Sequence, residues 1–201
     1  DNAATFKFLA NIDPTVRSIV IGSGGASLDT NGFDIAPAAS FASGSTGSLT
    51  KQGAGKLTLS TANDYSGGTN VNAGTLLVNA AGAVGSGAVT VNTGGILGGT
   101  GSIAATAQIT SGGILTPGNS GVGNLTVGGL TLDSGSVATY EFNTSPANDH
   151  VAVSVAGGLT INGGAITLVQ EGTSTPFTTL GTYNLISFSG SISGTGISSL
   201  S

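Results

Sequence analysis

The chain has 201 residues, of which 38% are hydrophobic and only 6% are charged, and its formal net charge is −5. The hydrophobic content excludes a disordered chain. With nine acidic and four basic residues, the sequence lacks the basic surface that neutralises phosphates, so we expect no nucleic-acid partner. No apolar run approaches the roughly 20 residues of a transmembrane helix, so we expect no membrane insertion by this segment.

Glycine and small polar residues dominate the composition. The 36 glycines disfavour helices, because each interior glycine costs about 1 kcal/mol relative to alanine. Short runs of Val, Ile, Leu and Thr between Gly and Asn clusters are typical of strands. The chain has no cysteine and no methionine, and its weakly acidic, Ser/Thr-rich composition favours an extracellular or bacterial cell-surface location over a cytoplasmic one. We therefore predict an all-β protein outside the cell.

Residues 1–17 differ from the rest of the chain. They contain few glycines and carry Lys7, Asp13, Pro14 and Arg17. We predict that this segment forms an irregular N-terminal rung or cap, although residues 4–9 alternate in the manner of a strand.

Residues 18–170 contain a pattern that returns about every 20 residues. In each clear copy an aliphatic residue stands three positions before a glycine and another stands two positions after it, as in Val71-Asn-Ala-Gly74-Thr-Leu76. The marker glycines are Gly32, Gly55, Gly74, Gly94, Gly112, Gly135 and Gly164. A regular period of this length is the signature of a repeat architecture in which each unit stacks on the next.

We predict one coil of the chain per repeat, with each marker glycine taking a tight corner that requires positive φ or close backbone approach. Stacked coils place equivalent aliphatic residues above one another, facing inward. The first predicted ladder is Val71, Val91, Ile109, Leu132 and Ile161. A parallel ladder on the same wall is Thr69, Val89, Ala107, Leu130 and Leu159. The ladder facing them is Leu57, Leu76, Ile96, Ile114, Val137 and Ile166.

The predicted fold is therefore a right-handed parallel β-helix, or β-solenoid, of about seven to nine rungs, with less regular N- and C-terminal rungs on either side of the solenoid at residues 18–170. Residues 143–150 are an insertion within it. Residues 171–201 are predicted to form a C-terminal loop around Pro176 and terminal strands, including an alternating strand at 183–188. The competing interpretation is a β-sandwich, which also suits glycine-rich turns, but a sandwich gives no reason for the same residue types to return about every 20 positions.

Residues 49–78, which begin Leu49-Thr-Lys-Gln-Gly-Ala-Gly-Lys-Leu-Thr-Leu-Ser60 and continue through Tyr65-Ser-Gly-Gly-Thr to Gly74-Thr-Leu76, closely resemble the autotransporter-associated β-strand repeat. Later segments at 98–101, 116–120 and 149–153 are similar to what commonly follows it, so the resemblance covers roughly residues 25–190. It implies a parallel β-helix in secreted or surface-anchored bacterial proteins, including autotransporter passengers. It supplies no shared catalytic residues.

Three local patterns bear on chemistry. Gly53-Ala-Gly-Lys56 ends like a phosphate-binding loop, but Thr50 and Leu57 stand where that motif needs glycine and Ser or Thr, so we expect a turn between strands. His150, the only histidine, is the one possible base of a Ser/His/Asp triad. Its neighbour Asp149 would face the opposite side of a strand, which favours a polar loop-to-strand junction.

Carboxylates and aromatic rings are the remaining candidates. Besides Asp1, the acidic residues are Asp13, Asp29, Asp34, Asp64, Asp133, Glu141, Asp149 and Glu171. They are scattered, although Asp133 and Glu141 could approach one another across strands, and no Lys or Arg follows Lys56 to complete a lyase-like cluster. The aromatic residues weighed as a carbohydrate-stacking strip are Tyr65, Tyr140, Phe142, Phe177, Tyr183 and Phe188. They fall at different phases of the repeat, so we expect them to cover the core.

From these patterns we predict no catalytic residue, no metal site and no cofactor, and thus no enzyme. The leading function is a structural module of a secreted or cell-surface bacterial protein, acting as a rigid stalk or spacer or as a fibre-building subunit. Its expected partners are further copies of itself stacked head to tail or the neighbouring rungs of a longer chain. The alternative is an adhesion module that binds glycan or a host surface, and a carbohydrate-active β-helix enzyme is the third interpretation.

Overall fold

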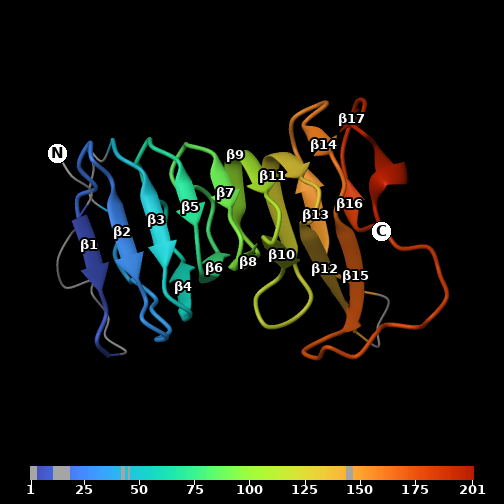
Figure 1. Cartoon of the computed structure of the whole chain (residues 1–201), viewed down its shortest axis with the longest axis horizontal. Helices are drawn as coiled ribbons and strands as arrows, with labels where there is room; N and C mark the ends of the chain where they lie inside the picture. Colours follow the sequence, from blue (N-terminus) through green and yellow to red (C-terminus); the bar gives the residue numbers. More distant parts are fainter. Residues whose placement is uncertain (1–3, 11–18, 42–43, 45, 144–146) are drawn as a thin grey trace.

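The computed structural model describes residues 4–10, 19–41, 44, 46–143 and 147–201. Short strands stack along one long axis from the N-terminus to the C-terminal end (Figure 1). The strands belong to two sheets, one of eleven strands (sheet A) and one of six (sheet B). Nine strands follow one another along the path of sheet A, which confirms a solenoid of seven to nine rungs.

Sheet A runs along one wall of the coil. Its strands in spatial order are β1 (Ala4–Lys7), β2 (Ala26–Asp29), β3 (Leu49–Gln52), β5 (Thr69–Val71), β7 (Val89–Val91), β9 (Ser102–Ile109), β11 (Asn124–Leu132), β13 (His150–Val153) and β16 (Ile186–Ser187). A branch of two strands leaves this path, in which β14 (Leu159–Ile161) pairs with β11 and β17 (Ser193–Gly194) pairs with β14. Strand β11 is long enough to pair with β13 through its first half and β14 through its second half. A register shift between Val127 and Gly129 separates the halves.

Sheet B forms the facing wall. Its strands in spatial order are β15 (Ala165–Gln170), β12 (Val137–Phe142), β10 (Ile114–Pro117), β8 (Gly95–Gly99), β6 (Gly74–Val78) and β4 (Lys56–Leu59). Every pairing between named strands in either sheet is parallel. This pairing confirms the parallel β-helix and excludes the sandwich, whose neighbouring strands would be mainly antiparallel.

The two predicted ladders of sheet A are confirmed. Val71 pairs with Val91, which pairs with Ile109, and the line continues through Leu132 to Ile161. The parallel line from Thr69 to Leu159 is also in register, and the residues of both lines are buried. One hydrophobic cluster extends from Phe8 to Ile161. Each rung therefore shares its core with its neighbours, as a solenoid requires.

The predicted ladder of sheet B is wrong at three rungs. Leu76 pairs with Leu97 rather than with Ile96, and the inward line continues through Leu115 and Ala138 to Ile166. Ile96, Ile114 and Val137 each lie one residue earlier and are only partly buried. The cause is the corner, because Gly74 aligns with Gly95 and not with Gly94. One additional corner residue moves the following side chain to the other face of the strand.

The glycines at the corners behave as expected. Gly74 has a φ of 63°, and a Cβ built on it would overlap the carbonyl oxygens of Gly53 and Gly55 in the rung below. Gly55 does not have positive φ; Gly53, with a φ of 76°, takes that corner instead, and a Cβ on Gly55 would overlap the backbone of Phe33. Both reasons for a corner glycine, positive φ and close approach, are therefore present.

The C-terminal part is less regular than the middle of the coil. The predicted strand at 183–188 shortens to the two residues of β16, and β17 is equally short. The polar loop around Pro176 is exposed. A short 3₁₀ helix, Ile197–Ser199, follows β17. No helix among the described residues is long and apolar enough to cross a membrane. The predicted segment boundaries at residues 17 and 170 stay predictions.

Candidate functional site

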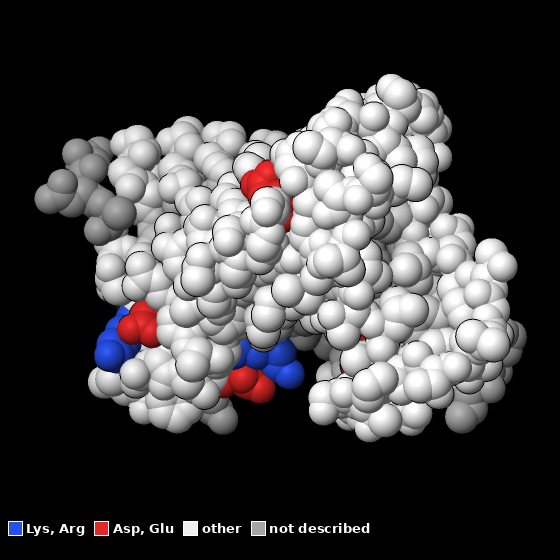
Figure 2. Space-filling model, turned by 45° about the vertical axis from the view of Figure 1, so that its right-hand side comes forward, with Lys and Arg blue, Asp and Glu red and all other residues white. Residues whose placement is uncertain are grey.

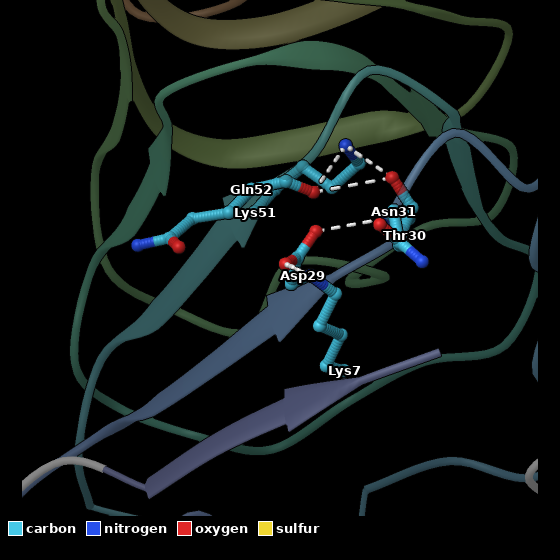
Figure 3. A network of polar contacts seen from close by, with 6 residues as sticks. All are labelled: Lys7, Asp29, Thr30, Asn31, Lys51 and Gln52. Carbon is cyan, nitrogen blue, oxygen red and sulfur yellow. Dashed lines mark hydrogen bonds and ion pairs between the residues drawn. The ribbon is translucent and has the colours of Figure 1, made fainter. Parts of the chain in front are cut away.

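A buried ammonium group lies at the corner between β3 and β4. Lys51 occupies the inward ladder of sheet A, where it pairs with Leu28 on one side and Val71 on the other, and its side chain is fully buried. Because Leu49 and Lys51 are two residues apart on one strand, they face the same side. The long side chain follows the wall to the corner, where its Nζ reaches polar atoms (Figure 3).

Four oxygens surround Lys51 Nζ. It donates to Thr30 Oγ1 at 3.1 Å and to the carbonyl oxygens of Gln52 at 2.9 Å, Gly53 at 2.7 Å and Ala73 at 2.9 Å. Thr30 in turn donates its hydroxyl to the Gln52 carbonyl at 3.1 Å. Burial lowers the pKa of Lys51 to about 8, and the nearby carboxylates of Asp29 and Asp34 act in the opposite direction. The side chain is thus still protonated at neutral pH.

The other charged side chains near this corner form surface pairs. Asp29 lies 3.8 Å from the ammonium of Lys7 and accepts the backbone N–H of Asn31 at 2.8 Å (Figure 3). Asp34 lies 3.5 Å from the ammonium of Lys56. Gly53 to Lys56 therefore connects two strands of different sheets, as expected, and does not precede a helix that would bind phosphate.

A carboxylate network lies at the other end of the coil. Asp149 is fully buried and accepts the backbone N–H groups of Gly123 and Glu141, each at 2.8 Å. The pKa of Asp149 is raised to about 7, chiefly by burial; its two N–H donors lower this pKa, and the carboxylates of Glu141 and Glu171 raise it. The sequence did not predict that this carboxylate is inside, because Asp149 precedes β13 in a polar segment.

The two glutamates of this network hold loops. Glu171 accepts the N–H of Val122 at 3.1 Å, and Glu141 accepts the N–H of Gly172 at 3.3 Å. Asp133, which we considered as a partner of Glu141, instead accepts hydrogen bonds from side-chain amides of neighbouring rungs. Its donors are Gln108 at 2.8 Å and Asn162 at 3.0 Å. These carboxylates therefore accept backbone and amide N–H groups, which is a structural use.

No acidic cluster suited to a metal is present in the ranges that the structure describes: no three His, Asp or Glu side chains are placed to hold an ion. Asp13 lies outside those ranges. Charged side chains are sparse on the face shown in Figure 2, where most of the surface is uncharged.

His150 lines an open hollow of about 530 Å³ between the loop before β11 and the segments around residues 148 and 184. The hollow is lined by Val122, Gly123, Asn124, Ala147, Asn148, His150 and Asn184. Asp149 is buried on the inner side while His150 is only partly buried, as the alternation predicted. Nε2 of His150 has no hydrogen-bond partner among the described residues. Burial lowers the pKa of His150, so its imidazole is neutral at neutral pH.

The aromatic side chains do not form a strip along the surface. Tyr65 and Tyr140 are fully buried. Phe142 stacks on Phe177 with ring centroids 4.2 Å apart, and Tyr183 meets both rings edge-on. Of the six residues that we weighed, Phe188 alone is exposed, at 41%. The rings therefore fill the core or hold the C-terminal loop against it.

The comparisons with known proteins agree with this geometry. Residues 49–78 match the family of passenger-associated-transport-repeats. The chain therefore contains an autotransporter passenger repeat. The passenger repeat includes β3 to β6, Lys51 and three of the four oxygens around its ammonium group. A curated relative of this passenger-repeat chain is the "Adhesin BmaC autotransporter" of Brucella suis biovar 1 (strain 1330), 36% identical over 135 residues. The alignment covers 65% of this chain and 4% of that much longer protein.

Proposed function

We propose that this chain is a rigid, non-enzymatic spacer within the passenger of a secreted or cell-surface bacterial protein. The observation that carries the proposal is the continuous parallel pairing of sheet A, in which nine strands follow one another over one shared core. Such a stack resists bending because each rung packs on both neighbours. At about 4.8 Å per rung, nine rungs hold two attached regions roughly 40 Å apart.

The spacer form has more support than the fibre form. The outer edge of β15, the last strand of sheet B, is covered by the chain itself. Gln170 N–H donates to Thr175, Phe177 N–H donates to Leu168, and Ile166 N–H donates to Ser201. An edge whose backbone groups are already paired offers little to a second molecule. Sheet A ends in β16 and β17, which have two residues each, and short edge strands also pair weakly.

Duplication of one rung tests the spacer proposal. Residues 72–91 connect Val71 to Val91, which are in register, so inserting a second copy of 72–91 after Val91 adds one complete coil. A spacer should fold with one additional rung and lengthen by about 5 Å, measured as the maximum dimension in small-angle X-ray scattering. A variant that unfolds, or that keeps the original length, would contradict the proposal. Sedimentation over a range of concentrations separates a monomeric spacer from an end-to-end fibre.

The hollow at His150 supports adhesion as a second candidate function. Asn124, Asn184 and His150 all line this hollow, and the buried Nε2 atom of His150 has no hydrogen-bond partner among the described residues. Amides and a neutral imidazole both donate to and accept from hydroxyl groups. We propose a neutral saccharide as the ligand class, since the lining residues carry no formal charge while His150 is neutral. The named adhesin among the relatives is consistent with this candidate.

Ligand-observed NMR with glucose, galactose and N-acetylglucosamine tests the adhesion candidate. Saturation transfer should be seen for at least one sugar and should fall several-fold in Asn184→Ala and Asn124→Ala. Asn72→Ala, on the corner between β5 and β6, is the matched control and should keep the signal. Equal transfer in all four proteins, or none in the wild type, would reject the hollow as a saccharide site while leaving the spacer proposal unchanged.

A further inference from the structure

The corner around Lys51 Nζ has the composition of a cation site. Its four oxygens come from three successive rungs: Thr30 follows β2, Gln52 ends β3 and Gly53 follows it, and Ala73 comes after β5. Three of them are backbone carbonyls. Hard cations such as Ca²⁺ and Mg²⁺ bind groups of oxygen ligands of this kind, including backbone carbonyls.

Stacking explains why these oxygens gather. Equivalent corners lie above one another, so their carbonyls converge where the chain turns from sheet A to sheet B. Carbonyl oxygens that converge away from water need a donor or a cation, because a buried acceptor left unpaired loses its hydrogen bonds to water without replacement. An ammonium has three donors and one positive charge. No carboxylate among the described residues hydrogen-bonds to Lys51 Nζ, so its charge is balanced mainly by carbonyl and hydroxyl dipoles.

We propose that this corner is a cation-binding site filled by the chain's own ammonium group, which takes the place that a dissolved metal ion would otherwise occupy. Lys51, Gln52, Gly53 and Ala73 all lie within the matched repeat 49–78. The repeat therefore carries its cation and three of the four ligands, and the preceding rung supplies the fourth from Thr30. This inference is independent of the spacer and adhesion proposals.

The proposal predicts that removing the tethered ammonium creates a vacant site. Lys51→Ala deletes Cγ, Cδ, Cε and Nζ, which together correspond to propylammonium. The variant should melt about 5–10 °C below the wild type, and its amide exchange in β2, β3 and β5 should rise about 10-fold or more. Propylammonium chloride should restore part of the lost Tm. K⁺ should restore less, because it does not fill the space left by the methylene groups of Lys51.

Two further variants separate the cation from packing. Lys51→Met keeps a long apolar side chain, which fills the space of the Lys51 methylene groups but leaves the four oxygens without a cation. We therefore expect most of the Tm loss to remain. Lys56→Met removes an exposed ammonium paired with Asp34 and should change the Tm by no more than about 2 °C. The wild type and Lys56→Met should not respond to propylammonium beyond the effect of an equal concentration of choline chloride.

Direct observation in the wild type keeps the proposal testable if Lys51→Ala does not fold. The Nζ protons of Lys51 should give a protected ammonium signal in ¹⁵N NMR at neutral pH, distinct from the rapidly exchanging signals of Lys7 and Lys56. A chelator should leave the Tm unchanged. A Lys51→Met variant as stable as the wild type, a Lys51→Ala variant that propylammonium does not rescue, or a Lys51 signal like those of the exposed lysines would overturn the proposal.

Discussion

Ile96 and Leu97 are consecutive residues of β8 that face opposite sides of sheet B. Leu97 is fully buried in the core, whereas Ile96 is partly exposed on the outer face. Their register partners in β10 behave in the same way, because Ile114 pairs with Ile96 and Leu115 pairs with Leu97. The inward line of sheet B is therefore set by the second glycine of the Gly94-Gly95 corner.

This relationship predicts opposite effects for neighbouring substitutions. Leu97→Asp buries a charge without a partner and should lower the free energy of unfolding by about 4 kcal/mol or more. Ile96→Asp places the same charge on the outer face and should change it by about 1 kcal/mol. Urea unfolding followed by circular dichroism measures both. A larger loss in Ile96→Asp than in Leu97→Asp would show that the register of β8 is wrong.

The corner glycines allow a second matched comparison. Gly32 and Gly74 both have positive φ, at 85° and 63°, so alanine costs about 1 kcal/mol of backbone strain at either. A Cβ on Gly32 meets nothing within 4 Å, whereas one on Gly74 overlaps the carbonyls of Gly53 and Gly55. Gly74→Ala should therefore lower the Tm clearly more than Gly32→Ala, measured by calorimetry. Equal losses would mean that φ alone selects glycine at these corners.

The sequence predicted the inward ladders of sheet A correctly but not the inward ladder of sheet B. The ladders through Val91 and Leu130 were predictable because the two inward residues of each rung lie two positions apart on one strand, with no corner between them. The ladder of sheet B failed at Ile96 because corners vary by one residue, and alternation of period two turns that variation into a change of face.

The two buried charges were not predicted for a different reason. Lys51 sits two residues after the inward Leu49, so alternation alone places it inside, but a charged residue is expected to face solvent. Only the stacked corners supply the oxygens that make its burial favourable. The same holds for Asp149, whose two N–H donors come from Gly123 and Glu141, residues that become its neighbours only in the folded coil.

Asp149 should make stability depend on pH. Its pKa in the folded protein, about 7, lies above its ordinary value of 3.8. The folded state thus binds the proton more tightly, so the stabilisation is complete below about pH 3.8 and is lost as the pH rises through about 7. Burial lowers the pKa of His150, which has the opposite effect on the pH dependence of stability. His150 is present in both the wild type and Asp149→Ala. The Tm difference between wild type and Asp149→Ala should therefore be larger at pH 5 than at pH 8.

Asp149→Ala should also be less stable than the wild type at either pH, because two buried N–H groups lose their acceptor. A Tm difference that is constant from pH 5 to pH 8 would show that Asp149 has the same pKa in the folded and unfolded states.

The aromatic cluster at the C-terminal loop should hold that loop without holding the coil. Phe177→Ala removes the ring that contacts both Phe142 and Tyr183. We expect faster proteolytic cleavage between residues 171 and 182, with unchanged amide exchange in β7 and β9, because rungs interact mainly with their nearest neighbours. Phe188→Ala, at an exposed ring, is the control and should leave the cleavage rate unchanged. Faster exchange in β7 would instead mean that the whole coil unfolds cooperatively.

The hydrogen bonds of Lys51 also bear on how the rod responds to tension. Backbone hydrogen bonds between rungs lie along the long axis, so a pull on the two ends loads every rung interface in series, and the weakest interface opens first. Lys51 belongs to one rung but bonds to Thr30 in the rung before and Ala73 in the rung after. It therefore reinforces two successive interfaces in the direction of the load, which makes β2 to β5 the segment expected to separate last when the molecule is stretched.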